Sequence, residues 1–144
     1  MISSYRGKYY FLSNFSDSRI TINGHSFLNA EAAFHSFKDL DRQYEFKNLD
    51  PSSAKRLGRR VRLRSDWEEI KDDIMYQVVK AKFTQNEILR IKLLNTGDEY
   101  LEEDNTWHDS YWGVCQCVKC QDKIAKNKLG KIHMRIRQEL REGN

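Results

Sequence analysis

The first thirty residues carry the alternation of polar and apolar positions that is typical of extended chain. Residues 5–15 and residues 19–27 both follow this pattern. The second segment contains Asn23-Gly24, a pair that favours the positive φ angles of a tight hairpin turn. We therefore predict a small strand component near the start of the chain, with a hairpin around this pair.

A helical period replaces the alternation after Asn29, which can cap a helix over residues 30–40. The apolar residues of this helix fall on one side, which we expect to be core. They are Ala30, Ala33, Phe34, Phe37 and Leu40. Further along, Asp50 followed by Pro51 predicts the start of a short helix that ends at Gly58.

The strongest helical pattern begins at Ser65, which forms a capping box with Glu68. Its expected core stripe consists of Trp67, Ile70, Ile74, Val78 and Ala81. Residues 86–96 repeat the helical spacing, and Gly97 fits the end of that helix. The apolar positions of this second helix are Ile88, Ile91 and either Leu93 or Leu94.

Residues 104–126 are polar and aromatic without a sustained period, and connections of this length are usually functional or disordered. The clustered aromatic residues favour function. A last amphipathic helix follows, with apolar positions Leu129, Ile132, Ile136 and Leu140. Three arginines, Arg135, Arg137 and Arg141, are available to its polar side. These patterns together predict a mainly α fold: one compact helical domain over residues 1–144 with a small N-terminal β component.

Composition narrows the class of protein. A chain of 144 residues holds one domain with a modest core. No apolar run approaches the roughly 20 residues that a membrane helix needs, and no export signal is visible. The only cysteines lie between Cys115 and Cys120, too few and too close for a disulfide framework, so we expect a reducing, cytoplasmic location. Lys and Arg number 25 against 21 Asp and Glu, a balance that suits phosphate-bearing ligands or nucleic acid without demanding either.

Three groups of residues carry candidate chemistry. Glu31, His35 and Lys38 share one face of the helix after Asn29 and offer a carboxylate, an imidazole and an amine; a solvated face with local ion pairs has the same spacing. The second group is a cationic stretch that either binds phosphate or keeps the surface soluble: Lys55, Arg56, Arg59, Arg60, Arg62 and Arg64. The third is the loop 107–112, whose rings can stack on a base or pack as a lid over the core.

The cysteines form the pattern Cys115-x-Cys117-x-x-Cys120, which could bind zinc if His108 or His133 supplied a fourth ligand. Structural zinc usually takes its ligands as two separated pairs, so reduced thiols are the favoured interpretation. The glycine-rich and histidine motifs of common nucleotide-binding proteins and metalloproteases are absent, and we expect no cofactor.

The order of the short motifs resembles that of the NADAR (YbiA-like) family over nearly the whole chain. The blocks that carry the resemblance include Phe11-Leu-Ser-Asn-Phe15, Ala30-Glu-Ala-Ala-Phe-His-Ser-Phe-Lys38, Ala54-Lys-Arg-Leu-Gly-Arg59, Asp109-Ser-Tyr-Trp-Gly113 and Asn127-Lys-Leu-Gly130. Where members of the family often have a glycine-rich stretch before the last block, this chain has its three cysteines. His35 stands where other members can carry a different polar residue.

The resemblance implies a mainly helical N-glycosidase that hydrolyses the ribosyl C1–N bond of phosphoribosyl or ADP-ribosyl substrates. The implied substrates are phosphoribosylamino-pyrimidine intermediates of riboflavin biosynthesis, or ADP-ribose attached to guanine in nucleic acid. The residues carried over by motif are Asn14, Phe15, Glu31, Lys38, Arg59, Asp109 and Trp112.

Residue chemistry gives a role to all of these except Asn14, which is predicted only as a substrate-binding residue. Glu31 would stabilise the positive charge on the sugar and activate water, and Asp109 is the candidate general acid. Lys38 would act as a cation or as a nucleophile toward the C1 aldehyde. Phe15 and Trp112 would stack on base or sugar, with Arg59 and Arg60 clamping phosphate. The alternative is a module that binds ADP-ribose or nucleic acid without catalysis. In that case the two carboxylates would oppose binding of an anion.

Overall fold

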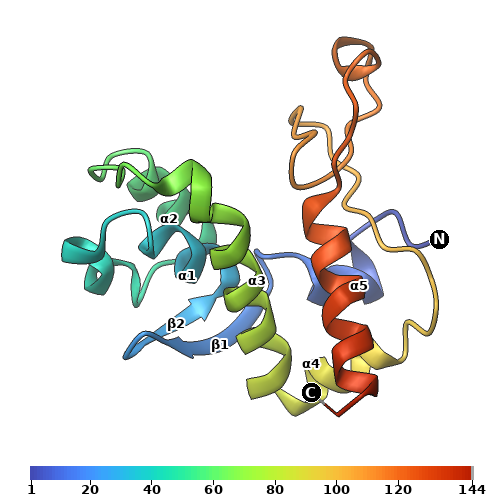
Figure 1. Ribbon diagram of the computed structural model, residues 1–144, viewed down its shortest axis with the longest axis horizontal. Helices are drawn as coiled ribbons and strands as arrows, with labels where there is room; N and C mark the ends of the chain where they lie inside the picture. Colours follow the sequence, from blue (N-terminus) through green and yellow to red (C-terminus); the bar gives the residue numbers. More distant parts are fainter. Residues whose placement is uncertain (144) are drawn as a thin grey trace. The chain divides into compact units, whose positions relative to one another are not determined.

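The hairpin predicted around Asn23-Gly24 is present in the computed structural model, which describes residues 1–143 (Figure 1). Strands β1 (Asp17–Ile22) and β2 (His25–Asn29) pair antiparallel. Asn23 and Gly24 have φ angles of 53° and 78°, which lie in the left-handed region that a two-residue hairpin turn requires. The predicted N-terminal β component is therefore confirmed.

The chain divides into two compact units. One, the hairpin unit, comprises Asn14–Arg90; the other, the terminal unit, comprises Met1–Ser13 and the chain from Ile91 onward. The expectation of one domain over residues 1–144 stays a prediction.

Helix α1 (Ala30–Ser36) follows β2 directly, and the Oδ1 atom of its cap Asn29 accepts a hydrogen bond from the amide of Ala32 at 2.8 Å. The predicted extension of this helix to Leu40 is wrong. The hydroxyl of Ser36 donates to the carbonyl oxygen of Ala33 at 2.6 Å, and the next amide turns to a different carbonyl oxygen. Such local side-chain bonding competes with the helical ladder and ends it early.

The chain beyond α1 forms a 3₁₀ segment, η2 (Leu40–Phe46). Leu40 is 49% exposed, so its assignment to the core is wrong. The other four apolar positions predicted for this stretch are buried: Ala30, Ala33, Phe34 and Phe37.

Helix α2 (Pro51–Gly58) begins as predicted, because the Oδ2 atom of Asp50 accepts the amide of Ser53 at 3.1 Å. Helix α3 (Trp67–Gln85) begins after Asp66 instead of after a capping box at Ser65. The carboxylate of Asp66 does not cap it. Both of its oxygens accept from the guanidinium of Arg64, at 2.6 Å and 3.2 Å.

Helix α3 packs on β1, and α1 packs on α2 and β2, which encloses the core of the hairpin unit. The buried positions of α3 are Trp67, Met75, Val78, Val79, Lys82 and Phe83. The predicted stripe is correct at Trp67 and Val78, but Ile70, Ile74 and Ala81 are only partly buried. The inward face lies one residue further along than the apolar pattern indicated.

The extended conformation predicted for residues 5–15 is wrong, because most of that stretch is a 3₁₀ segment, η1 (Gly7–Leu12). Gly7 has a φ of 57°, which turns the chain away from an extended path. Helix α4 (Glu87–Leu94) buries Leu93 but leaves Ile88 and Ile91 at 70% and 47% exposure, so these two are not core residues.

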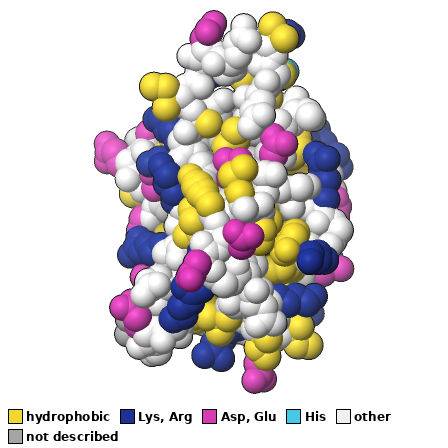
Figure 2. Space-filling model, turned by 90° about the vertical axis from the view of Figure 1, so that its right-hand side faces the viewer, with side chains coloured by type: hydrophobic (Ala, Val, Ile, Leu, Met, Phe, Trp, Pro, Cys, Tyr) yellow, Lys and Arg dark blue, Asp and Glu magenta, His cyan; other side chains and the backbone are white. Residues whose placement is uncertain are grey.

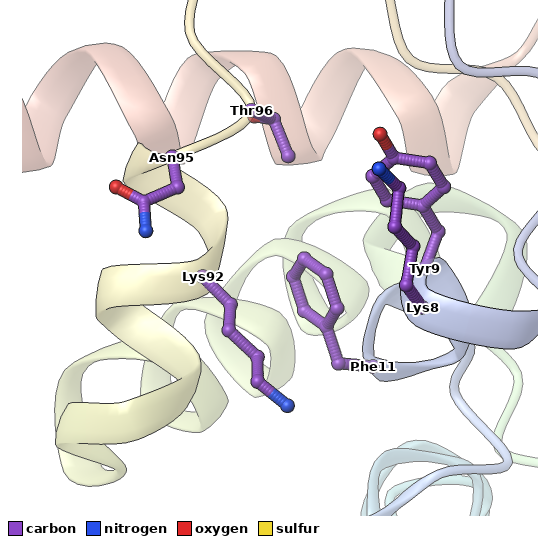
Figure 3. A pocket seen from close by; sticks show the side chains of 6 residues that line it. All are labelled: Lys8, Tyr9, Phe11, Lys92, Asn95 and Thr96. Carbon is purple, nitrogen blue, oxygen red and sulfur yellow. The ribbon is translucent and has the colours of Figure 1, made fainter.

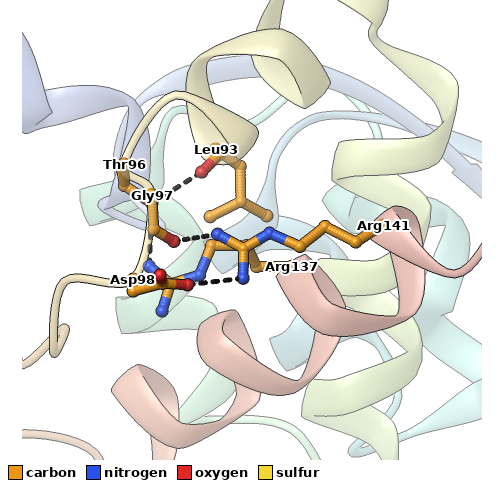
Figure 4. Close-up of polar contacts among 6 residues, drawn as sticks. All are labelled: Leu93, Thr96, Gly97, Asp98, Arg137 and Arg141. Carbon is orange, nitrogen blue, oxygen red and sulfur yellow. Dashed lines mark hydrogen bonds and ion pairs between the residues drawn. The ribbon is translucent and has the colours of Figure 1, made fainter.

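Helix α5 (Lys128–Arg141) is tied to the segment after α4 by two arginines (Figure 4). Arg137 donates to the hydroxyl of Thr96 at 2.9 Å, and that hydroxyl donates to the carbonyl oxygen of Leu93 at 2.6 Å. Arg141 donates to the carbonyl oxygen of Gly97 and pairs with Asp98. Arg137 is therefore buried, which corrects its assignment to the polar side of the helix.

Charged side chains of both signs are interspersed on the face shown in Figure 2. That distribution gives this face no large field of one sign. Among the described helices, none has the length and apolar character needed to cross a membrane.

Candidate functional site

A carboxylate and an imidazole form a close pair on α1. Glu31 Oε1 lies 2.7 Å from His35 Nε2, and the two side chains are only 15% and 9% exposed. Since a carboxylate accepts hydrogen bonds, we place a proton on His35 Nε2. Glu31 also lies in the first turn of α1, where the helix dipole stabilises negative charge, and its amide donates to the carbonyl oxygen of Asn14 at 3.1 Å. Glu31 is therefore held in one orientation.

The backbone of α2 holds the other side of the imidazole. A Cβ atom added at Gly58 would stand 2.6 Å from His35 Nδ1 and 2.9 Å from the adjoining ring carbon, closer than packed atoms approach. Glycine at this position lets the two helices meet around the ring, which limits how far His35 can turn away from Glu31.

Gly58→Ala should lower the free energy of unfolding by about 1–3 kcal/mol, because the added methyl group displaces the His35 ring. The direction of the change in unfolding free energy tests the packing, because alanine at an unhindered helical position would stabilise the protein by about 1 kcal/mol. Urea denaturation measures the change. Ser52→Ala, an exposed substitution on the same helix, is the matched control. Stabilisation by Gly58→Ala would contradict the close packing of His35.

Lys38 lies just beyond the end of α1, near Glu31 and the aromatic core. Its Nζ atom is 5.7 Å from the centroid of the Trp67 ring. Burial lowers the pKa of Lys38; the charge of Glu31 acts in the opposite direction and that of Arg59 adds to the lowering. Lys38 thus experiences the charges of both Glu31 and Arg59.

The arginines of the cationic stretch that lie beyond α2 include both exposed and structural residues. Arg59 and Arg60 are exposed at the end of α2, as a phosphate clamp requires. Arg64 instead pairs with Asp66 and donates to the carbonyl oxygen of Phe37 at 3.3 Å, which is a structural role.

Asn14 and Phe15 begin the hairpin unit. Asn14 is buried, and its Nδ2 atom donates to the sulfur of Met75 at 3.4 Å. Its Oδ1 atom is buried without a partner among the residues that the structure describes. Phe15 is partly exposed. The backbone of Asn14 contacts Glu31 directly, so this part of the first motif supports the helix that carries the carboxylate.

Lys82 is a candidate that the sequence analysis missed. It is fully buried, and its Nζ atom donates to the hydroxyl of Ser16 at 3.2 Å. Burial lowers the pKa of Lys82 to about 7. The helical spacing could have indicated its burial. Lys82 stands seven residues after Met75 and four after Val78, on the buried face of α3. Strongly shifted, buried groups of this kind cluster at functional sites.

Asp109 and Trp112 belong to the terminal unit, in the loop before α5. The Oδ1 atom of Asp109 accepts the amides of Tyr111 and Trp112, both at 2.9 Å. Asn105 bonds to the amide and the carbonyl oxygen of Asp109 through its side chain, at 3.0 Å and 2.9 Å. The rings of Tyr111 and Trp112 meet edge to face at 4.8 Å. Asp109 therefore shapes the loop on which Trp112 is presented.

The three cysteines converge on His108, also in this loop, and not on His133. The ligand atoms of all four residues lie within 4.8 Å of one another. His133 lies in the core of the terminal unit, where its Nδ1 atom is 3.0 Å from the hydroxyl of Tyr5. Of the two histidines considered as a partner for the thiols, the structure selects His108.

A pocket of about 320 Å³ opens in the terminal unit between η1 and α4 (Figure 3). Its lining residues are Lys8, Tyr9, Phe11, Lys92, Asn95 and Thr96. It holds two ammonium groups and two aromatic rings, but none of the site residues predicted from sequence.

A model of the NADAR domain matches residues 3–141 of the chain. The chain belongs to the NADAR domain family. N-glycosidase YbiA of Escherichia coli (strain K12) is 35% identical over 133 residues, which cover 89% of this chain and 79% of that protein. The Riboflavin biosynthesis protein VVA0006 of Vibrio vulnificus is 35% identical over 137 residues, 92% of this chain and 36% of its own length.

The NMR structure of the E. coli protein YbiA matches this NADAR chain with a TM-score of 0.79 at 31% identity. The match covers 99% of this chain and 88% of YbiA. The predicted family and the mainly α fold class are confirmed. The relatives named N-glycosidase confirm the expectation of a hydrolase that acts on N-glycosyl bonds.

Proposed function

We propose that this NADAR protein hydrolyses the C1–N bond of a ribosyl substrate that carries phosphate, with Glu31 as the carboxylate at C1. The observation that carries the proposal is the fixed Glu31–His35 pair, with its 2.7 Å contact, in a setting where Lys38 also experiences Arg59. The Glu31 carboxylate and the cations Lys38 and Arg59 suit a substrate that develops positive charge on its sugar and bears negative charge on its phosphate.

The reaction follows from this arrangement. As the C1–N bond weakens, its electron pair moves to nitrogen and positive charge builds on the ribose ring, which the Glu31 carboxylate stabilises. Glu31 then takes one proton from a water molecule while the water oxygen bonds to C1. The proton that Glu31 has taken passes to the leaving nitrogen, so that the products are a ribosyl hydroxyl and a free amine and the carboxylate is restored. His35 holds the carboxylate in place throughout.

We assign Lys38 the role of a cation. The nearby charge of Glu31 and the face of the Trp67 ring both favour its charged form, although burial opposes it. Arg59 and Arg60, exposed at the end of α2, would hold the phosphate oxygens in the fork geometry that guanidinium groups provide. Phe15 would offer its partly exposed ring to the sugar or base, and Asn14 would support Glu31 from behind.

The roles predicted in the terminal unit, Asp109 as the general acid and Trp112 as the stacking ring, stay predictions. Two backbone amides donate to Asp109 Oδ1, which holds this carboxylate in the turn that leads to Trp112.

Two substrate classes fit this chemistry. A phosphoribosylamino-pyrimidine is supported by relatives named riboflavin biosynthesis proteins in Vibrio vulnificus and Zea mays. ADP-ribose attached to guanine presents the same C1–N bond next to phosphate. The cytoplasmic location stays a prediction.

Mass spectrometry of the products tests the proposal. The purified protein is incubated separately with a phosphoribosylamino-pyrimidine and with an oligonucleotide that carries ADP-ribosylated guanine. Free pyrimidine and ribose phosphate would support the first class. Release of ADP-ribose with the oligonucleotide restored would support the second. If neither substrate is cleaved, the proposal is wrong; binding without cleavage would then favour the non-catalytic binding module.

A further inference from the structure

The loop before α5 gathers four side chains that metals prefer. The Nδ1 atom of His108 lies 3.2 Å from Cys117 Sγ, 3.5 Å from Cys120 Sγ and 3.9 Å from Cys115 Sγ. The sulfurs of Cys115 and Cys117 are 3.4 Å apart. All four ligand atoms lie within 4.8 Å of one another, which leaves room for a single ion between them.

We propose that these four residues form a structural zinc site. Zinc bonds to thiolate sulfur at about 2.3 Å and to imidazole nitrogen at about 2.0 Å in a tetrahedron, so its ligand atoms stand roughly 3.8 Å (two sulfurs) or 3.6 Å (sulfur and nitrogen) apart. The four separations given above, 3.2–3.9 Å, scatter around those edges, and all pairs of ligand atoms lie within 4.8 Å. A small closure of the loop around an ion would complete the geometry.

The chemistry of the ligands selects the metal. Three thiols and one imidazole suit zinc, whereas Ca²⁺ and Mg²⁺ take oxygen ligands. A disulfide does not account for the cluster, since all three cysteines are free and a sulfur–sulfur bond is about 2.0 Å long. Four protein ligands also fill the tetrahedron, which is the composition of structural sites and not of catalytic ones.

Residues 115–126, which carry the cysteines, have little regular secondary structure. Val118 and Ile124, two of their apolar residues, are 82% and 89% exposed, and their one regular element is the short 3₁₀ turn η3 (Val118–Cys120). His108 has a φ of 67°, a left-handed conformation that costs energy for a residue with a side chain. A metal bond to His108 would offset that cost, because metal binding stabilises the folded site directly.

The site would fix the segment between its ligands His108 and Cys115. Asp109 comes directly after His108, and Trp112 is presented on the turn that Asp109 makes. Zinc would therefore add a fixed point to this loop, beside the hydrogen bonds of Asn105 and Asp109. The proposal concerns the terminal unit and holds whichever substrate the protein cleaves.

Metal analysis of the protein as purified, after growth with added zinc and without chelators, is the first test. We expect about one zinc per chain and little iron. Cobalt exchanged into the site should give intense thiolate-to-metal absorption in the near ultraviolet and the visible bands of a tetrahedral ion. A chain with less than about 0.1 zinc that also gives no such cobalt spectrum would overturn the proposal, and so would stoichiometric iron.

Two variants locate the ion. Cys117→Ser and His108→Ala should each lower the zinc content at least fivefold, while His25→Ala, on strand β2 of the other unit, keeps it. Far-ultraviolet circular dichroism checks the fold of each variant. Because the cobalt spectrum is taken on the unmodified chain, the proposal is tested even if a variant fails to fold. Equal loss of zinc from His25→Ala and His108→Ala would contradict the assignment.

Discussion

Glu31→Gln is expected to lower kcat about 10²–10⁴-fold, whichever ribosyl substrate the protein cleaves. Glutamine keeps the size of the side chain and can still accept a hydrogen bond from His35 Nε2. It loses the negative charge that stabilises the sugar in the transition state and the basicity that takes a proton from water. Since the lost interaction acts mainly in the transition state, kcat should fall far more than KM rises.

Steady-state rates, measured with the substrate that the product assay identifies, check this result. Glu68→Gln is the matched control, because Glu68 is a 77% exposed carboxylate of the same unit whose partner is Lys71. This control should retain the rate of the unmodified protein. A folded Glu31→Gln variant with full turnover would remove Glu31 from the reaction.

Lys82→Met should raise stability most at neutral pH and progressively less as the pH rises. The pKa of buried Lys82 is about 7 in the folded protein, against 10.5 for an ordinary lysine. Between these values the folded chain binds one proton fewer than the unfolded chain, so this group makes stability increase with pH. Below about pH 7 both states carry the proton, and the cost of burying charge, at most about 5 kcal/mol, is fully present.

Urea denaturation at pH 7, 8.5 and 10 measures the effect. Methionine fills similar space without a charge, although it gives up the hydrogen bond to Ser16. The difference in unfolding free energy between variant and unmodified protein should shrink as the pH rises. Lys131→Met, on the exposed side of α5, makes the same change in net charge and should leave the pH profile unaltered. A constant difference for Lys82→Met would mean that the ammonium is charged throughout this range.

Local signals predicted the fold best where a backbone conformation is set by one or two residues. The Asn23-Gly24 turn, the Asn29 cap and the Asp50-Pro51 start are all present, because each acts through its own neighbours. The failures come from competing partners. Ser36 donates to the carbonyl oxygen that would have continued α1, and Glu68 of the predicted capping box pairs with Lys71 instead.

The arrangement of the candidate site residues was predictable only in part. Helical spacing brought Glu31 and His35 together correctly, whereas Lys38 lies beyond the end of the helix. The packing of Gly58 against His35 joins two helices and leaves no local pattern. Lys82 was not among the predicted site residues, although helical spacing from Met75 and Val78 places it on the buried face of α3.

Strand β2 leads directly into α1, so the pairing of the hairpin determines the position of the Glu31 carboxylate. The strand register runs from the Ile22–His25 pair beside the turn, through an irregularity between Asp17 and Ile20, to the Asp17–Asn29 pair at the open end. Glu31 follows two residues after Asn29. Because side chains alternate along a strand, a slip of one residue would send Asn29 to the opposite face and remove the cap of α1. The length of the turn at Asn23-Gly24 therefore sets the position of Glu31, and an inserted turn residue would act on the site without touching it.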